Sequence, residues 1–194
     1  MPNLSLKRSL SDFWVLIVPG LNNSGPQHWQ SRWERLYPAF ERIEQKYWDQ
    51  PDLAIWSQRL RDVLAKKAAL NKPLKPILLI AHSFGCLTTV HSALAEGPLV
   101  KELIAGALLV APADPEKFEV SAGLGASLPF PATVVGSLND PWMEASETVK
   151  WAKLWGAEYV DVGALGHINA DSQLGDWQVG QAVLARLVQT VRAN

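Results

Sequence analysis

One serine stands in a context that could make its hydroxyl a nucleophile. Ser83 follows the apolar run Ile77–Ala81 and His82, and Phe84-Gly85 leads from it into small and apolar residues. This order matches G-x-S-x-G, with Ala81 at the first glycine position, which places a serine on a sharp turn between strand and helix. That turn is crowded, so its flanking residues must be small. The pattern predicts a nucleophile; the alternative is a serine that only caps the following helix.

A serine hydroxyl needs a general base to take its proton. The sequence offers four histidines: His28, His82, His91 and His167. His167 lies in the glycine-flanked segment 163–169, directly after the last expected strand, where the chain order serine, acid, histidine places the base. His82 immediately precedes Ser83, so its side chain is expected to point away from the hydroxyl. His167 is therefore the predicted base.

The acid that orients this base is expected on the loop after the strand Ala132–Gly136. Asp140 lies there, followed by Pro141, which stiffens the turn. A carboxylate at this position would hold the imidazole in one tautomer and stabilise the imidazolium. The alternative is that Asp140 caps a helix beginning at Pro141. Three other aspartates follow less suitable strands or loops: Asp114, Asp161 and Asp171.

Two backbone N–H groups are needed to stabilise a developing oxyanion. One belongs to the residue after the nucleophile, Phe84, and the other to the loop after the first strand, where Leu21 is the predicted donor. Asn22 and His28 on that side, and Trp142 near the predicted acid, are candidate pocket residues. The loop lacks the Lys-Ser/Thr of a phosphate-binding loop and the G-x-G-x-x-G of a dinucleotide fold. The chain also lacks clustered zinc ligands, which argues against a zinc site.

Short apolar runs alternate with longer amphipathic stretches along the chain, which predicts an α/β fold with a mostly parallel sheet. The expected strands are Trp14–Val18, Glu41–Tyr47, Ile77–His82, Leu103–Val110, Ala132–Gly136 and Ala157–Val162. The expected helices are Gln27–Tyr37, Leu53–Leu70, Phe84–Glu96, Met143–Trp155 and Trp177–Arg192, with a linker at Pro73–Pro76. This gives a compact three-layer sandwich of about six strands without a large cap. With Ala111–Pro131 as the main rim loop, we expect a shallow site for a small or short-chain substrate.

The length and charge of the chain exclude several classes of protein. The 194 residues fit one domain, spanning 1–194, and the formal net charge of −1 lacks the footprint of a nucleic-acid binder. The apolar runs are too short to cross a bilayer, and the N-terminus does not read as a secretory signal. We therefore expect a cytoplasmic protein without a nucleic-acid or membrane partner. Cys86, the single cysteine, is expected to be buried behind the serine turn.

Taken together, four segments resemble the retinoblastoma-binding-protein-9/YdeN-like family of small serine hydrolases. They are Pro19-Gly20 through His28-Trp29, His82-Ser83-Phe84-Gly85, Asn139-Asp140-Pro141 and Gly166-His167-Ile168-Asn169. The resemblance spans nearly the whole chain and implies a capless α/β-hydrolase domain without a metal or organic cofactor. It also implies a catalytic triad at Ser83, Asp140 and His167. The Leu-x-Cys-x-Glu motif of the human namesake is absent, so its retinoblastoma-protein partner is not expected here.

The sequence thus predicts a serine hydrolase that cleaves a small carboxylic ester or activated amide through an acyl-enzyme on Ser83. Its expected partner is a small-molecule substrate, and a protein partner is not identified. Two alternatives remain open. One is a catalytically weak protein that keeps the fold as a protein-binding module. The other is an enzyme that transfers the acyl group to an acceptor other than water.

Overall fold

A six-stranded parallel sheet forms the centre of the molecule. The computed structural model describes residue 6 and residues 9–70, 75–95 and 102–193. Every pairing within the sheet is parallel, and the spatial order is β2-β1-β3-β4-β5-β6. The strands are β1 (Trp14–Val18), β2 (Phe40–Arg42), β3 (Ile77–Ser83), β4 (Ile104–Pro112), β5 (Ala132–Gly136) and β6 (Glu158–Asp161). Because they run the same way, their carboxyl ends meet at one edge, where ligands bind in such sheets.

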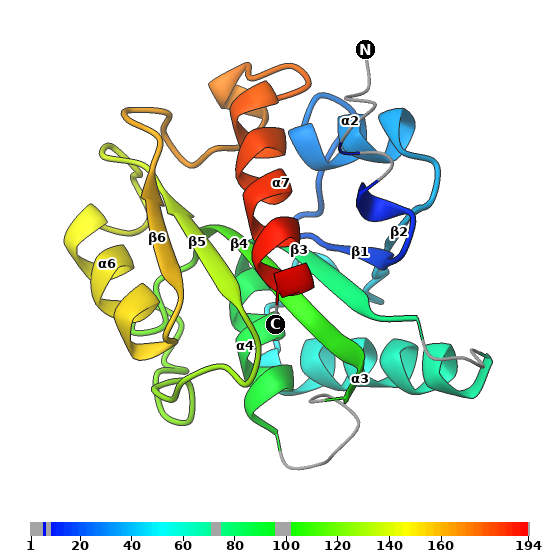
Figure 1. Cartoon of the computed structure of the whole chain (residues 1–194). Helices are drawn as coiled ribbons and strands as arrows, with labels where there is room; N and C mark the ends of the chain where they lie inside the picture. Colours follow the sequence, from blue (N-terminus) through cyan, green and yellow to red (C-terminus); the bar gives the residue numbers. More distant parts are fainter. Residues whose placement is uncertain (1–5, 7–8, 71–74, 96–101, 194) are drawn as a thin grey trace.

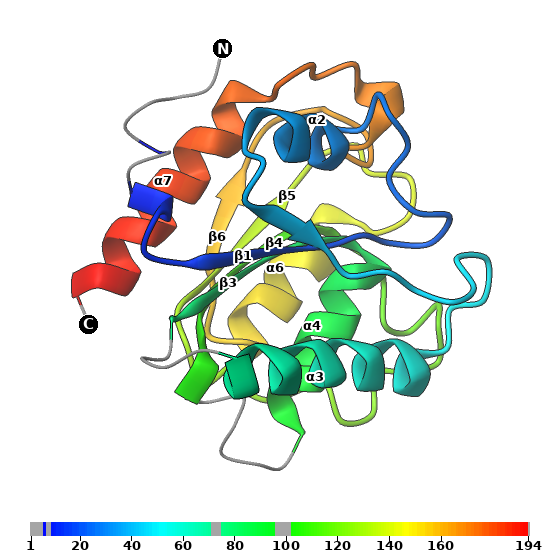
Figure 2. The same ribbon diagram turned by 90° about the vertical axis from the view of Figure 1, so that its right-hand side faces the viewer.

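Helices cover both faces of this sheet. They are α2 (Trp29–Leu36), α3 (Leu53–Leu70), α4 (Phe84–Leu94), α6 (Ala145–Leu154), the short 3₁₀ helix η1 (Ala170–Ser172) and α7 (Gln178–Ala193). Helices α3, α4 and α6 pack on one face, whereas α2 and α7 pack on the other (Figures 1 and 2). The prediction of a three-layer α/β fold with six mostly parallel strands is confirmed.

The strands send alternate side chains to two separate hydrophobic clusters. In β1, Leu16 and Val18 pack toward α3 and α4, while Val15 and Ile17 pack toward α2 and α7. All four are at most 2% exposed, which explains why the strand is a continuous apolar run in the sequence. The tryptophans at helical spacing in α2 are core residues on the second face.

Two predicted elements differ from the structure. The strand expected at Glu41–Tyr47 is the shorter β2, Phe40–Arg42, because the chain leaves the sheet edge after the bond from Ile43 N–H to the Ile17 carbonyl. Farther along, Trp48 packs edge-on against Trp56 of α3 instead of extending the strand.

The helix expected from Met143 begins two residues later, after Glu144 in extended conformation. The predicted helix end at Glu96 and the first half of the Pro73–Pro76 linker lie outside the described residues.

Candidate active site

Ser83 occupies the sharp turn where β3 ends and α4 begins. Its backbone has φ 53° and ψ −123°, a combination that a non-glycine residue adopts at a cost, often at functional sites. Although Ser83 stands at the N-cap position of α4, its side chain makes no capping hydrogen bond. The alternative of a merely capping serine is therefore wrong for this structure. The turn instead leaves the hydroxyl free to point toward the carboxyl edge of the sheet.

Two glycines allow neighbouring backbone to approach this turn. A Cβ on Gly85 would lie 2.2 Å from the Val18 carbonyl oxygen, so only glycine lets α4 begin this close to β1. A Cβ on Gly20 would lie 2.7 Å from the Cβ of Ser83. The loop after β1 consequently packs directly against the serine turn. The local sequence pattern thus reflects close backbone contact on both sides of the serine.

The three predicted polar side chains lie in one hydrogen-bonded row. The Ser83 Oγ is 2.9 Å from the Nε2 of His167, and the Nδ1 of His167 is 2.8 Å from one Asp140 carboxylate oxygen and 3.0 Å from the other. A carboxylate only accepts hydrogen bonds, so the Nδ1 carries the proton. The Nε2 is then an acceptor for the Ser83 hydroxyl, which is the tautomer that a general base requires.

Side-chain hydrogen bonds hold the two loops that carry Asp140 and His167 together. Asn139 Oδ1 accepts a bond from the Gly166 N–H at 2.7 Å. Ser137 Oγ, which is buried, accepts one from the Leu165 N–H at 2.9 Å. These bonds join the end of β5 to the loop after β6, and so fix the histidine opposite its carboxylate. Sequence reasoning missed both residues, although polar side chains directly after a buried strand were a usable signal.

Asp140 also organises its own turn. One carboxylate oxygen accepts a hydrogen bond from the Trp142 N–H at 2.9 Å. The helix α6 begins only at Ala145, and Glu144 occupies its N-cap position. Asp140 therefore does not cap that helix, and its second role is to close a short turn before it.

A row of three histidine rings backs the site. His82 is 5% exposed and its Nε2–H donates to the main-chain carbonyl of His167 at 2.9 Å. Its ring meets that of His167 edge to face at 4.9 Å between centroids, and that of His28 at 4.6 Å. Burial holds the pKa of His82 well below its ordinary value. His82 does not bond the Ser83 hydroxyl, but it supports the segment that carries the base.

His28 caps α2 and is neutral. Its Nδ1 accepts a hydrogen bond from the Gln30 N–H at 3.2 Å, so the proton lies on Nε2. Burial, and secondarily the Arg42 guanidinium, lowers the pKa of His28 to about 3. Its buried Nε2–H has no partner within the described part of the chain. A buried unpartnered donor is unusual in a folded protein, and this one belongs to a residue that lines the cavity described below.

Buried polar contacts fix the loop after β1. The Ser24 hydroxyl donates to Gln30 Oε1 at 2.6 Å, and Gln30 Nε2 donates to the Ile80 carbonyl at 3.1 Å. Arg42 reaches the same loop from β2, donating to Asn23 Oδ1 at 2.7 Å and to the Ser24 carbonyl at 3.0 Å. Its guanidinium also pairs with Glu34. The loop is thereby tied to the strand that carries the serine.

The two predicted oxyanion donors belong to the two segments that meet at the serine turn, α4 and the loop after β1. Phe84 is the first residue of α4, so its N–H has no partner within the helix. In the loop after β1, the N–H groups of Asn22 and Asn23 are engaged by the Trp48 and Gly20 carbonyls. Leu21, the predicted donor of this loop, lines the cavity.

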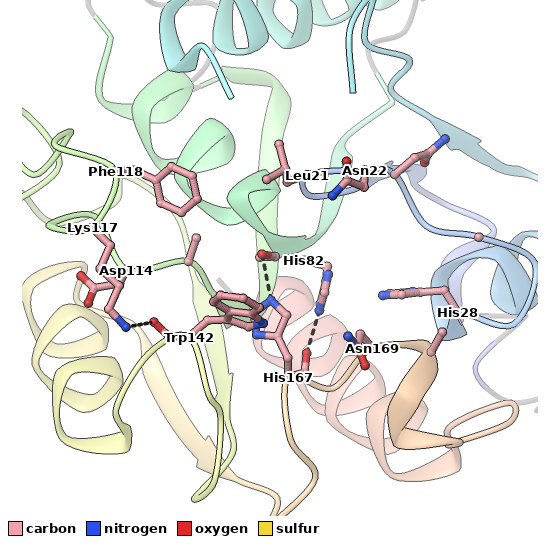
Figure 3. Close-up of a pocket in the computed structure, with 15 residues that line it drawn as sticks. Leu21, Asn22, His28, His82, Asp114, Lys117, Phe118, Trp142, His167 and Asn169 are labelled. Atoms are coloured by element: carbon pink, nitrogen blue, oxygen red, sulfur yellow. Dashed lines mark hydrogen bonds between the residues drawn. The ribbon is translucent and has the colours of Figure 1, made fainter. Parts of the chain in front are cut away.

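A cavity of about 570 Å³ lies over these residues. One side of the cavity, which we call the polar wall, is formed by Asn22, His28 and Asn169 (Figure 3). The opposite side, which we call the loop wall, is formed by Asp114, Lys117, Phe118 and Trp142. All three predicted pocket residues line it, Trp142 with 60% of its surface exposed at the rim. This volume is typical of pockets that bind drug-sized ligands, so the cavity does not limit the substrate to a short chain.

The other residues that the sequence analysis named lie outside the row of Ser83, His167 and Asp140. Asp161 accepts a bond from the Gly163 N–H, and Asp114 accepts one from the Glu116 N–H. Cys86 is buried as expected, and burial raises the pKa of its thiol well above the usual value. Within the described ranges, no group of three histidine, cysteine or acidic side chains could hold a metal ion. No helix in those same ranges is long and apolar enough to cross a membrane.

The parallel sheet, the flanking helices and the strand–turn–helix that carries Ser83 define an α/β-hydrolase fold. The family model described as serine hydrolase matches residues 15–186. A proposed YdeN-like hydrolase from Pectobacterium atrosepticum shares 38% identity over 97% of both chains, with a TM-score of 0.87. The chain therefore belongs to the YdeN-like serine hydrolase family of the α/β-hydrolase superfamily, and it is a hydrolase.

More distant structures share the fold alone. The ydeN gene product of Bacillus subtilis is 19% identical over 90% of this chain and 98% of its own, with a TM-score of 0.68. Est1E of Butyrivibrio proteoclasticus, solved with ferulic acid bound, is 14% identical over 92% of this chain and 89% of its own, with a TM-score of 0.67. No curated protein matches the chain significantly.

Proposed function

We propose that this chain is a carboxylesterase-like serine hydrolase, acting as a single domain, that forms an acyl-enzyme on Ser83. The observation that carries the proposal is the unbroken row from the Ser83 hydroxyl through the His167 imidazole to the Asp140 carboxylate, with spacings of 2.9 and 2.8 Å. Geometry of this kind is how a weak hydroxyl nucleophile is activated. The cavity over the row gives a small-molecule substrate access to it.

In the first half of the reaction, the Ser83 Oγ attacks the ester carbonyl carbon and its proton passes to the His167 Nε2. Asp140 accepts the hydrogen bond from Nδ1–H and stabilises the imidazolium that forms. The carbonyl oxygen becomes an oxyanion, which accepts hydrogen bonds from the N–H groups of Phe84 and Leu21. Collapse of the tetrahedral intermediate breaks the bond to the alcohol oxygen, which takes the proton from His167.

In the second half, water attacks the acyl-enzyme carbonyl and gives a proton to the same nitrogen of His167. The second tetrahedral intermediate collapses, the Ser83 oxygen recovers the proton, and the carboxylic acid leaves. His82 and His28 stay neutral beside the base, because burial disfavours their charged forms. They therefore place no positive charge next to the imidazolium that both halves require.

Steady-state hydrolysis of p-nitrophenyl acetate, butyrate and octanoate by wild type and by Ser83→Ala tests this function. We expect turnover of at least one ester by wild type, and a loss of about a thousandfold or more in kcat with Ser83→Ala. Ser121→Ala is the control, because this serine lies outside the row and its hydroxyl makes an exposed hydrogen bond to the Glu116 carboxylate. Equal turnover by wild type and Ser83→Ala, with both folded, would contradict the proposal.

A further inference from the structure

The orientation of Asn169 in the polar wall is fixed by its backbone neighbours. Its Oδ1 accepts a hydrogen bond from the Asp171 N–H at 3.0 Å, where it caps η1. An N–H group can only bond the oxygen end of an amide, so the nitrogen end must face the other way. In Figure 3 that nitrogen end is turned toward His82. It has no hydrogen-bond partner in the described part of the chain, and it faces the cavity.

His28 adds a second donor of fixed direction. Because its Nδ1 is used by the Gln30 N–H, its remaining polar atom is the Nε2–H, and this atom is buried without a partner. The ring extends from α2 toward His82, beside Asn169 (Figure 3). In both side chains, the acceptor atom is thus already hydrogen-bonded to a backbone N–H group. The polar atoms that these two cavity-lining residues leave without a protein partner are donors.

Charge separates this wall from the opposite one. Among the described residues that line the cavity, the one lysine or arginine is Lys117, which lies in the loop wall. The polar wall has no charged side chain, since burial keeps the pKa of His28 at about 3. The loop wall offers instead the rings of Phe118 and Trp142, so the two walls suit chemically different parts of one substrate.

We propose that Asn169 and His28 form a specificity subsite that binds an uncharged acceptor oxygen of the substrate, a hydroxyl or carbonyl, next to the scissile ester. The preferred substrates are then oxygenated esters, rather than simple alkyl esters of the same length. This inference rests on the proposed esterase function and names its substrate class. Asn169 acts as a specificity residue, and the triad performs the bond cleavage.

Matched ester pairs measure the subsite directly. On the acyl side the pair is p-nitrophenyl butyrate and p-nitrophenyl 3-hydroxybutyrate, and on the alcohol side it is propyl butyrate and glycerol monobutyrate. We expect wild type to prefer the hydroxylated member of at least one pair by about fivefold in kcat/KM, the worth of one net hydrogen bond. A ratio of two esters is insensitive to the fraction of folded enzyme, so it isolates recognition.

Two variants then test the named residues. Asn169→Asp keeps the Oδ1 that caps η1 but replaces the donor with an acceptor, and His28→Ser keeps an N-cap oxygen on α2 but removes the ring donor. We expect each to bring the preference close to unity. His91→Ser, at a histidine of α4 outside the cavity lining, is the matched control and should leave the ratio within about twofold of wild type.

The outcomes separate this inference from the proposed function. Equal kcat/KM for both members of both pairs in wild type would overturn the subsite, as would a preference that survives both Asn169→Asp and His28→Ser. In each case Ser83-dependent hydrolysis of the plain esters would still support the esterase. Absence of Ser83-dependent hydrolysis of every ester would overturn both proposals together.

Discussion

The two walls of the cavity are built in different ways. The polar wall continues into buried structure: His28 caps α2, and the adjoining loop is bonded to Gln30 and Arg42. The loop wall is more exposed, and an exposed hydrogen bond crosses it from Lys117 Nζ to the Trp142 carbonyl at 2.6 Å. Exposed bonds of this kind contribute little to stability, whereas buried polar networks are costly to disrupt.

This difference assigns separate tasks to the two sides. Catalysis needs donors and acceptors held to within about half an ångström, which a buried network can provide. Acceptance of varied substrates needs a surface that tolerates change, which an exposed loop provides. We therefore expect changes near the polar wall and the triad to reduce kcat or stability. Changes in the loop wall should mainly alter substrate preference.

The largest effect expected on the buried side comes from Asp140→Asn. The amide cannot act as an anionic partner and favours the wrong imidazole tautomer, so kcat should fall by about 10³ to 10⁴ on the preferred ester. The fold should be retained, because Asn keeps an oxygen for the Trp142 N–H. Circular dichroism and steady-state kinetics provide the measurement. A loss below tenfold would show that Asp140 does not serve the base.

Acid should weaken the buried side through its neutral histidines. The unfolded chain protonates His28 below its ordinary pKa of 6.5, whereas the folded protein does so only near a pKa of about 3. The unfolded state therefore binds more protons between these values, and the free energy of unfolding falls as pH falls from 6.5. At pH 5 the loss from His28 alone is about 2 kcal/mol.

Urea titrations between pH 7 and pH 5 measure this loss. His28→Asn keeps a capping side chain but removes the titrating ring, so its stability should depend less on pH than that of wild type. His91→Asn is the comparison: burial also lowers the pKa of this half-buried histidine of α4, so the variant should reduce the pH dependence too, but less than His28→Asn does. Parallel pH dependences for wild type and His28→Asn would contradict the assignment of a neutral buried His28.

A smaller loss is expected when the loop after β1 is released. Arg42→Ala removes bonds to Asn23 and to the Ser24 carbonyl, and loosens the segment that presents Leu21. We expect kcat to fall about tenfold, less than the ~10²- to 10³-fold cost of deleting an oxyanion donor. Arg186→Ala, an exposed arginine on α7 that pairs with Glu158, is the comparison variant. A change in KM alone, with kcat retained, would place the role of Arg42 in substrate binding.

The smallest effect is expected in the loop wall. Lys117→Met removes the exposed bond to the Trp142 carbonyl, and the free energy of unfolding should change by less than about 0.5 kcal/mol. KM for octanoyl and acetyl esters should shift by about two- to threefold relative to one another. If kcat on every ester fell tenfold, the loop wall would be part of the rigid machinery and the distinction between the walls would fail.

The sequence predicts the serine turn well because its demands are local. Ser83 needs a buried strand before it and small neighbours around it, and the close contacts of Gly20 and Gly85 show why. The parallel sheet was predictable for a similar reason, since strands covered on both faces become continuous apolar runs. Chain order alone was enough to select His167 and Asp140, which the fold brings within hydrogen-bonding distance.

Features that depend on contacts between distant segments were not predictable. The bond from His82 to the His167 carbonyl joins residues 85 positions apart, and nothing in the local pattern indicates it. The direction of the Asn169 amide depends on η1, a single short turn. The β2 strand was misplaced because an edge strand of three residues carries little periodicity, and its end is set by where Trp48 finds a partner.

The central claim is that Ser83 is the nucleophile activated by His167. Labelling with a fluorophosphonate, followed by peptide mass spectrometry, tests it most directly because the reagent reacts with an activated serine and needs no knowledge of the substrate. We predict one adduct on the peptide that contains Ser83 in wild type, strongly reduced labelling in His167→Ala, and none in Ser83→Ala. An adduct on another serine, or no adduct in folded wild type, would contradict the account.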